Sequence, residues 1–232
     1  GRNISDIKNC IGETQVMTEN SFRFQASVNR YIMRIPGAGT DEISNRREEA
    51  LVFESIAHLD VADETVFCDP DTGVRIAVYY PNGRTCDPTN LDEAVASFEE
   101  VKKVHQSGLS VPHTFSYRKK MDDYEALCMK KGHVKLPGYQ KSRAGAERLM
   151  EALEDIAEAP VLCHIDCACI NFLVLPQENR IRILDWEYGA MGDPFIDLAH
   201  FAIHAQYTRA QADELLTRYL QREPEDNEYL RY

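Results

Sequence analysis

Short stretches in the first third of the chain alternate between apolar and polar residues. Residues 22–26 and 31–35 form one pair of such stretches, and residues 65–68 and 74–79 form a second pair around a turn at 69–73. A period of two is the pattern of a half-buried strand, and Gly, Pro, Asn and Asp favour the turns between strands. The pattern therefore predicts a small, mostly β region built from hairpins.

Apolar residues recur every three or four positions in most of the remaining chain, which predicts helices. One helix, between the two hairpins, is expected to open at residues 40–42. Its predicted buried stripe is Ala50, Leu51, Phe53, Ile56 and Ala57. Further helices are predicted over residues 91–106, 117–131, 141–157 (with Leu149, Leu153 and Ile156 on its apolar face), 194–205 and 211–221, the last preceded by a capping-box pair, Thr208 and Gln211.

Three short apolar runs between residues 161 and 184 enclose a cluster of polar side chains. The first run leads into a loop that carries His164, Asp166 and Asn171, and the other two, residues 172–175 and 181–184, are separated by a turn. Two strands joined by a turn form a hairpin, whose outer ends lie close together. Asn171 and Asp185 are therefore predicted to be neighbours, with Asp166 on the loop that leads in.

This cluster has the residue types that phosphoryl transfer from ATP requires. The reaction needs a carboxylate to orient and deprotonate a hydroxyl, and oxygen ligands for Mg²⁺, which takes one or two protein carboxylates or carbonyls. The order Asp-x4-Asn, hairpin, Asp is typical of the catalytic loop and metal-binding Asp of kinases. Asp166 is the candidate base, and Asn171 and Asp185 are the candidate magnesium ligands. Taken singly, each could also be a turn or capping residue.

Residues 162–199 resemble the kinase-like phosphotransferases that act on small molecules, namely choline and ethanolamine kinases and aminoglycoside phosphotransferases. The resemblance rests on His164-x-Asp166-x4-Asn171, on Asp185-Trp186-Glu187-Tyr188 and on the segment GDPFIDLA at 192–199, and it is nearest to the bacterial choline kinases. It implies an α+β, bilobal, protein-kinase-like fold. A small β-rich N-terminal lobe would span residues 1–80, and a larger, mainly helical C-terminal lobe would span residues 81–232, with a hinge near the break at 80–83.

The resemblance also implies a nucleotide site in the N-terminal lobe. The loop before the first hairpin would cover the nucleotide, which makes Thr18, Asn20 and Ser21 candidates for binding ATP. Arg34 would contact phosphates and pair with a helix Glu, which is Glu49 by family register. From the residues alone, residues 18–21 could equally be an ordinary surface loop, and Arg34 could face water on an edge strand.

The acceptor is expected to be a small hydroxyl compound, most simply the cation choline. Aromatic faces and carboxylates hold a quaternary ammonium, and the resemblance places Tyr188 in the choline pocket beside Glu187. His204 stands where the family has a cation-facing Glu, and the sequence ends at Tyr232, ahead of the aromatic helices that close the pocket in the family. Two explanations of these departures are therefore considered: the sequence is an incomplete chain, or its acceptor site differs from that of the family. Ethanolamine, another amino alcohol, an aminoglycoside and a pseudoenzyme that only binds nucleotide are the alternatives.

Two neighbouring features are expected to be structural. Trp186 is predicted to lie in the core, and Asp193 and Asp197 are predicted to brace the catalytic loop through backbone hydrogen bonds. Cys163, Cys167 and Cys169 crowd that loop, but a structural zinc site uses a second, distant pair of ligands, which the sequence lacks. Reduced thiols of a cytosolic protein are the expected state.

Composition limits the partners of the protein. The 232 residues, 44% of them hydrophobic, can form one large domain or two lobes around a cleft. A net charge of −12 argues against a nucleic-acid partner, whose binding depends on Lys and Arg. No apolar run approaches the ~20 residues of a membrane helix, and the N-terminus has no signal-peptide pattern. A cytoplasmic enzyme without a membrane partner is predicted, and the sequence does not indicate an oligomeric state.

Overall fold

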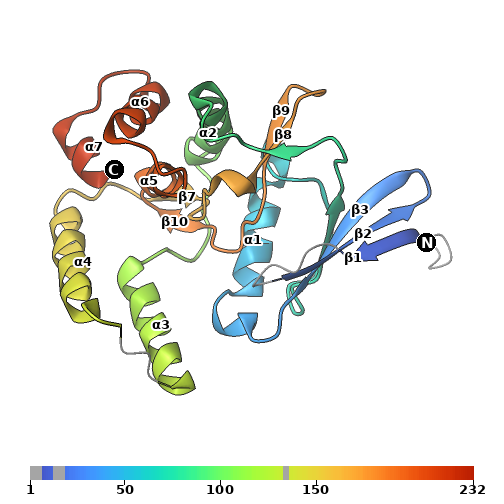
Figure 1. The fold of residues 1–232 in the computed structure, drawn as a ribbon, viewed down its shortest axis with the longest axis horizontal. Helices are drawn as coiled ribbons and strands as arrows, with labels where there is room; N and C mark the ends of the chain where they lie inside the picture. The colour runs from blue at the N-terminus through green and yellow to red at the C-terminus, as the bar shows by residue number, and fades with distance from the viewer. Residues whose placement is uncertain (1–6, 13–18, 133–135) are drawn as a thin grey trace.

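An antiparallel sheet of five strands forms the N-terminal lobe in the computed structural model, which describes residues 7–12, 19–132 and 136–232 (Figure 1). The strands lie in the order β1-β2-β3-β5-β4. Their bounds are Ile7–Gly12 (β1), Glu19–Ala26 (β2), Asn29–Pro36 (β3), Thr65–Cys68 (β4) and Arg75–Val78 (β5). Both predicted hairpins are confirmed. The edge strand β1 was not predicted, because all six of its side chains are exposed and its alternation is weak.

The first hairpin extends further than its alternating core. Its ladder runs from the pair Ala26 and Asn29 to the pair Glu19 and Pro36, so that Asn20 lies opposite Ile35 and Ser21 lies opposite Arg34. The expectation that Asn20 and Ser21 belong to a loop was therefore wrong, because backbone pairing with β3 draws them into β2. Thr18 lies outside the described residues.

The helix of the N-terminal lobe, α1 (Arg46–Ile56), begins later than predicted. The Asn45 side chain accepts hydrogen bonds from the backbone N–H groups of Arg47 and Glu48 and caps the helix, whereas residues 40–42 form a separate 3₁₀ turn, η2 (Thr40–Glu42). A second turn, η3 (Ala57–Leu59), follows α1. The later start shifts the buried face to Arg46, Glu49, Val52, Phe53 and Ile56. The predicted burial of Leu51 and Ala57 was wrong, since both are exposed.

Six helices form most of the described C-terminal lobe (Figure 1). They are α2 (Leu91–His105), α3 (Tyr117–Lys131), α4 (Tyr139–Glu154), α5 (Phe195–His204), α6 (Arg209–Leu220) and α7 (Asp226–Arg231). All but the short α7 were predicted, and the capping box of Thr208 and Gln211 is present. The main core gathers α2, α5 and α6 around Phe98, Phe172 and Trp186. In contrast, α3 and α4 contribute no fully buried residue, and the predicted apolar residue Leu149 is 68% exposed.

Two small antiparallel sheets position the catalytic hairpin. One has the order β6-β8-β9 and the other pairs β10 with β7. Their bounds are Arg84–Thr85 (β6), Val161–Cys163 (β7), Phe172–Leu175 (β8), Arg180–Ile183 (β9) and Ala190–Gly192 (β10), with a 3₁₀ turn, η4 (Cys169–Asn171), before β8. The predicted hairpin is β8-β9. Since β6 pairs with β8, the chain joins this sheet directly after the break at 80–83, which is compatible with the lobe boundary proposed there.

The whole arrangement is α+β and bilobal, as the sequence predicted. The N-terminal sheet and α1 lie beside the small sheets, and α3 and α4 extend from the helical lobe (Figure 1). Among the described residues, no helix is long and apolar enough to span a membrane.

Candidate active site

The catalytic hairpin closes as its sequence predicted. The backbone N–H of Leu184 donates to the Asn171 carbonyl at 2.7 Å, which joins the two outer ends of the hairpin. The Asn171 side-chain amide donates to the Asp166 carbonyl at 2.8 Å and to its carboxylate Oδ2 at 3.1 Å. Asp166 and Asn171 are thus in direct contact, and Asp185 directly follows the residue that joins the strands.

The backbone of this loop is strained at two positions. Ile165 has φ = +72° and Asp185 has φ = +64°, both in the left-handed region. For a β-branched residue such as Ile165 this conformation is costly, and it persists only when its surroundings hold it. Asp197 supplies that restraint, since its carboxylate accepts the N–H of Ile165 at 2.6 Å and that of His164 at 2.9 Å. The predicted bracing role of Asp197 is confirmed.

A buried histidine completes this brace. His105 Nε2 lies 2.9 Å from Asp197 Oδ2, and its Nδ1 lies 2.7 Å from the Tyr219 hydroxyl. Burial alone raises the pKa of Asp197, but the hydrogen bond and charge of His105, with the charge and backbone N–H of His164, outweigh burial and hold it below its usual value. Sequence reasoning missed His105, because a His in the last turn of a helix is typical of an ordinary helix end.

Asp193 has a different role from the one predicted. Its carboxylate accepts the Phe195 N–H at 3.0 Å, at the start of α5, and lies 2.7 Å from Arg231 Nε. It therefore braces α5 and α7 and not the catalytic loop, because it stands two residues before a helix. All seven cysteines are free, and burial raises the pKa of the Cys163 and Cys167 thiols, which keeps both protonated.

The nucleotide-site candidates surround the end of β3. Arg34 Nη1 lies 3.7 Å from Asp185 Oδ1, so the structure brings the predicted phosphate-contacting residue to the predicted metal ligand. Glu49 is buried, and its carboxylate lies 3.3 Å from Arg46 Nη1. The pairing of Glu49 with Arg34 stays a prediction. Arg46 was missed because a basic residue beside Arg47 at a helix start reads as solvent-exposed.

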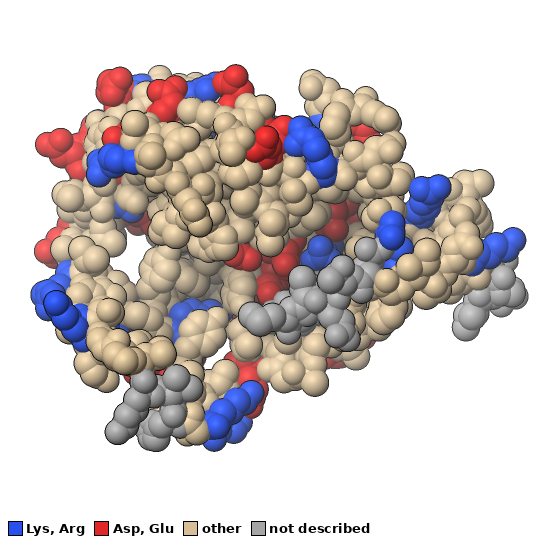
Figure 2. Space-filling model, viewed as in Figure 1, with Lys and Arg blue, Asp and Glu red and all other residues tan. Residues whose placement is uncertain are grey.

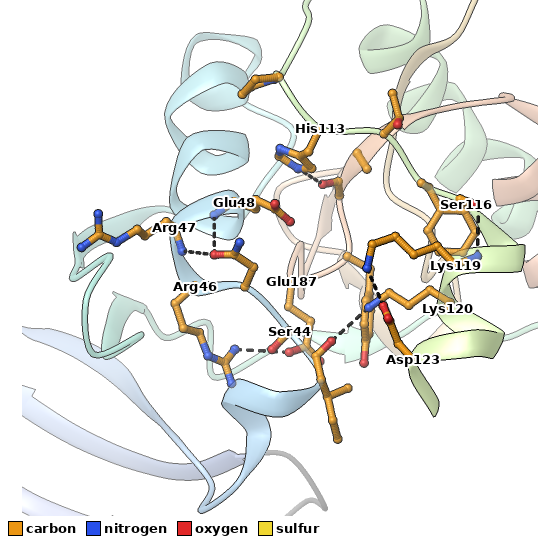
Figure 3. A pocket seen from close by; sticks show the side chains of 18 of the residues that line it. Ser44, Arg46, Arg47, Glu48, His113, Ser116, Lys119, Lys120, Asp123 and Glu187 are labelled. Carbon is orange, nitrogen blue, oxygen red and sulfur yellow. Dashed lines mark hydrogen bonds and ion pairs between the residues drawn. The ribbon is translucent and has the colours of Figure 1, made fainter. Parts of the chain in front are cut away.

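Arg46 connects α1 to the acceptor candidates. Its Nη1 also lies 3.3 Å from Glu187 Oε2 (Figure 3). All three side chains of this cluster, Arg46, Glu49 and Glu187, are buried. Burial raises the pKa of Glu187, the nearby charge of Asp185 adds to the effect, and Ser44 and Arg46 partly oppose it. Glu187 is therefore committed to an internal ion pair beside the site.

Tyr188 lines a cavity of about 730 Å³ together with Glu187, Lys120, His113 and Ser44 (Figure 3). The cavity lies between the start of α1, the start of α3 and the segment after Asp185. Asp166, Asn171 and Asp185 are not part of its lining, so it adjoins the catalytic cluster without covering it. Trp186, fully buried, donates its indole N–H to the Ile183 carbonyl and belongs to the core as predicted.

The α5 side chain that reaches Asp166 is His200, one turn before the predicted His204. His200 Nε2 lies 3.5 Å from Asp166 Oδ1, and the rings of His200 and His204 lie 4.7 Å apart. Burial lowers the pKa of His200, although the Asp166 charge opposes this effect. His204 is exposed, and its role at the acceptor stays a prediction.

Comparison with known proteins decides the family. Residues 5–231 match the sequence profile of choline/ethanolamine kinases. The chain belongs to the choline/ethanolamine kinase family. It is therefore a phosphotransferase that uses an alcohol group of a small molecule as acceptor, as the catalytic motif predicted.

Individual members of the choline/ethanolamine kinase family are similar over most of the chain. The protein LicA of Haemophilus influenzae (strain Rd) is 26% identical over 208 residues, which cover 88% of this chain and 76% of that protein. A choline/ethanolamine kinase family protein from Mesorhizobium loti is 28% identical, with a TM-score of 0.75 over 94% of this chain and 71% of that one. The choline kinase LicA from Streptococcus pneumoniae has a TM-score of 0.84 over 96% of this chain and 77% of that one, and at 23% identity it shows the fold alone.

Proposed function

We propose that this kinase transfers the γ-phosphate of ATP to the hydroxyl group of choline. The observation that carries the proposal is the contact of Asp166 with Asn171 at the outer ends of the hairpin, with Tyr188 three positions after Asp185. The names of the similar choline kinases support choline as the acceptor. Acidic side chains gather in the recess between the lobes (Figure 2), which favours a cation there.

Asp166 is the residue that receives the proton of the acceptor hydroxyl. The Asn171 amide donates a hydrogen bond to its carboxylate and fixes its orientation, while His200 lies on its other oxygen. A positioned carboxylate base contributes about 10²- to 10⁴-fold to the rate. His200 with a lowered pKa stays neutral near pH 7, and therefore leaves the Asp166 carboxylate free to accept the proton.

The side chains of Asn171 and Asp185 fit a magnesium site. The amide nitrogen of Asn171 is committed to Asp166, which leaves its side-chain oxygen as a hard donor, and Asp185 supplies a carboxylate just after the strand that pairs back to Asn171. Oxygen donors of this kind suit Mg²⁺, which neutralises charge on the phosphates when it is bound. Arg34 would contact the same phosphates, and Thr18, Asn20 and Ser21 are proposed to lie along the nucleotide.

The acceptor is proposed to enter from the side of Tyr188. An aromatic face within about 6 Å holds a quaternary ammonium. Glu187, in its buried ion pair with Arg46, would lie beside the acceptor, and His204 would lie at the exposed end of α5. Ethanolamine and other amino alcohols share the required hydroxyl and positive charge.

The first test is release of ADP from Mg-ATP with choline, ethanolamine and an aminoglycoside as acceptors. Saturable release with choline is expected, together with at least a ~100-fold loss of turnover in Asp166→Asn. The matched control is Asp213→Asn on α6, where the half-buried Asp213 pairs with Arg209, and it should retain activity. Release with another acceptor alone would keep the reaction but replace the substrate, and normal turnover by Asp166→Asn would reject Asp166 as the base.

A further inference from the structure

The proposed acceptor face of Tyr188 already carries a positive charge from the protein itself. The Nζ atom of Lys120 lies over the Tyr188 ring, 4.9 Å from its centroid, and 5.9 Å from the centroid of Tyr124. Both distances lie within the ~6 Å range of cation–π contacts. Lys120 and Tyr124 are four residues apart on α3, and therefore share one face of the helix.

A single hydrogen bond to a neutral group holds the Lys120 ammonium in this position. Its Nζ donates to the Ile43 carbonyl at 3.0 Å, which is a neutral acceptor (Figure 3). Within the described part of the chain, no carboxylate lies within ion-pair distance of Lys120. Burial lowers its pKa, while the more distant charges of Asp123, Glu187 and Glu48 favour the ammonium form.

The neighbouring Lys119 shows the contrast. Its Nζ lies 2.6 Å from the Asp123 carboxylate, and its side chain is largely exposed. Lys119 thus forms an ordinary surface ion pair, whereas Lys120 turns inward onto an aromatic ring. Both lysines line the same cavity of about 730 Å³ as Tyr188, so an acceptor approaching Tyr188 through this cavity meets the Lys120 ammonium.

We propose that Lys120 is a specificity-determining residue of the acceptor site, whose ammonium occupies the Tyr188 ring face until a cationic acceptor displaces it. Because this inference rests on the proposed function, Tyr188 is taken as the face that receives the acceptor cation. A quaternary ammonium cannot share that face with Lys120, since two like charges in contact repel each other. Displacement is feasible, because Lys120 loses one hydrogen bond to a neutral carbonyl and no ion pair with any side chain that the structure describes.

The Lys120 ammonium should therefore weaken the binding of cationic acceptors selectively. A competing internal cation weakens the binding of a charged acceptor but has little effect on an uncharged acceptor of the same shape. The pair choline and 3,3-dimethylbutan-1-ol differs in this way, since a carbon atom replaces the quaternary nitrogen. Removal of the Lys120 charge should therefore change the ratio of their kcat/KM values.

The test compares Lys120→Met with wild type, with Lys119→Met as the matched control and Lys120→Arg as the variant that keeps the charge. Lys120→Met retains the length of the side chain and is expected to raise kcat/KM for choline by about 2- to 30-fold, the range of one cation–π contact. The value for 3,3-dimethylbutan-1-ol should change less than about 2-fold on the same reasoning. Lys120→Arg, which keeps the charge, should retain the wild-type ratio of the two kcat/KM values. Lys119→Met, which removes a charge that is already paired with Asp123, should change that ratio less than Lys120→Met does. An unchanged or lower value for choline in a folded Lys120→Met protein would overturn the inference.

Binding of tetramethylammonium, measured by calorimetry without nucleotide, separates this inference from the proposed function. Tighter binding by Lys120→Met than by wild type is expected, and this readout needs no turnover. If wild type does not phosphorylate choline but Lys120→Met binds tetramethylammonium more tightly, the proposed function fails and the role of Lys120 stands. If wild type phosphorylates choline and Lys120→Met shows no tighter binding, the role of Lys120 fails alone.

Discussion

At the scale of single residues, the site depends on side chains that act behind the catalytic cluster. The carboxylate of Asp197 accepts hydrogen bonds from two backbone N–H groups of the strained loop and contacts His105. Both side chains are buried. A buried carboxylate with these partners cannot be removed without leaving several polar groups unsatisfied. The geometry of Asp166 therefore depends on Asp197, although Asp197 does not touch it.

Replacement of Asp197 by Ala should show this dependence. Loss of one partner from a buried charged network typically costs about 3–5 kcal/mol, and we expect a decrease of that size in the free energy of unfolding. Urea denaturation measures the change. Asp193→Ala should cost less, about 1–2 kcal/mol, because its carboxylate is part-exposed, it caps the start of α5, and Arg231 keeps Glu158 as a second partner. Equal losses in the two variants would contradict the bracing role.

The contribution of Glu187 to the free energy of unfolding should depend on pH. Its pKa in the folded protein lies above its unfolded value of about 4.5, because burial opposes its charge. Ionisation at pH 7 therefore costs stability, and this cost is relieved as the pH falls through the raised pKa toward 4.5. Wild type should gain stability relative to Glu187→Gln as the pH is lowered from 7 toward 4.5, as measured by urea unfolding at each pH. Parallel stability curves for the two proteins would refute the raised pKa.

At the scale of elements, the lobe is divided between a packed group of helices and an outlying pair. Helix α2 buries Ala94, Phe98 and Val101 against the catalytic hairpin, while α3 and α4 bury no residue fully. Surface ion pairs such as Arg143 with Asp122 connect the outlying pair, and such pairs contribute little stability. The element that carries Lys120 and Tyr124 is thus among the less firmly held.

Amide hydrogen exchange should follow this division. Helices with few buried apolar contacts open at a low free energy, whereas core helices exchange only near global unfolding. We expect α3 and α4 to exchange at least about ten times faster than α2 when followed by mass spectrometry, which corresponds to a difference of 1.4 kcal/mol or more. Choline with nucleotide should slow exchange in α3. Equal protection of α2 and α3 would show that α3 is held more firmly than its burial indicates.

At the scale of the whole molecule, the fold and the arrangement of the catalytic hairpin could be predicted from the sequence, whereas several residues of the site could not. Alternation predicted β2 to β5, and the ordered spacing of Asp166, Asn171 and Asp185 predicted the hairpin with its ends together. These signals are local in sequence.

The missed residues depend on contacts between distant segments. His105 meets Asp197 across 92 positions, and Arg46 meets Glu187 across 141. Nothing in the neighbouring sequence distinguishes either one from an ordinary polar residue on a helix. His200 was missed in favour of His204, because the turn of α5 that faces Asp166 is set by packing of the whole helix.

The Arg46 cluster has a consequence for control of the enzyme. In protein kinases, the helix that carries the conserved Glu can swing, and its position switches activity on and off. Here Arg46 forms buried ion pairs both with Glu49, on the same helix, and with Glu187, which follows the catalytic hairpin. Rotation of α1 would strip a buried charge of its partner, so an inactive form with the helix displaced is disfavoured. Such a kinase is assembled ready to act, and its output should follow the supply of its substrates more than any switch within the fold.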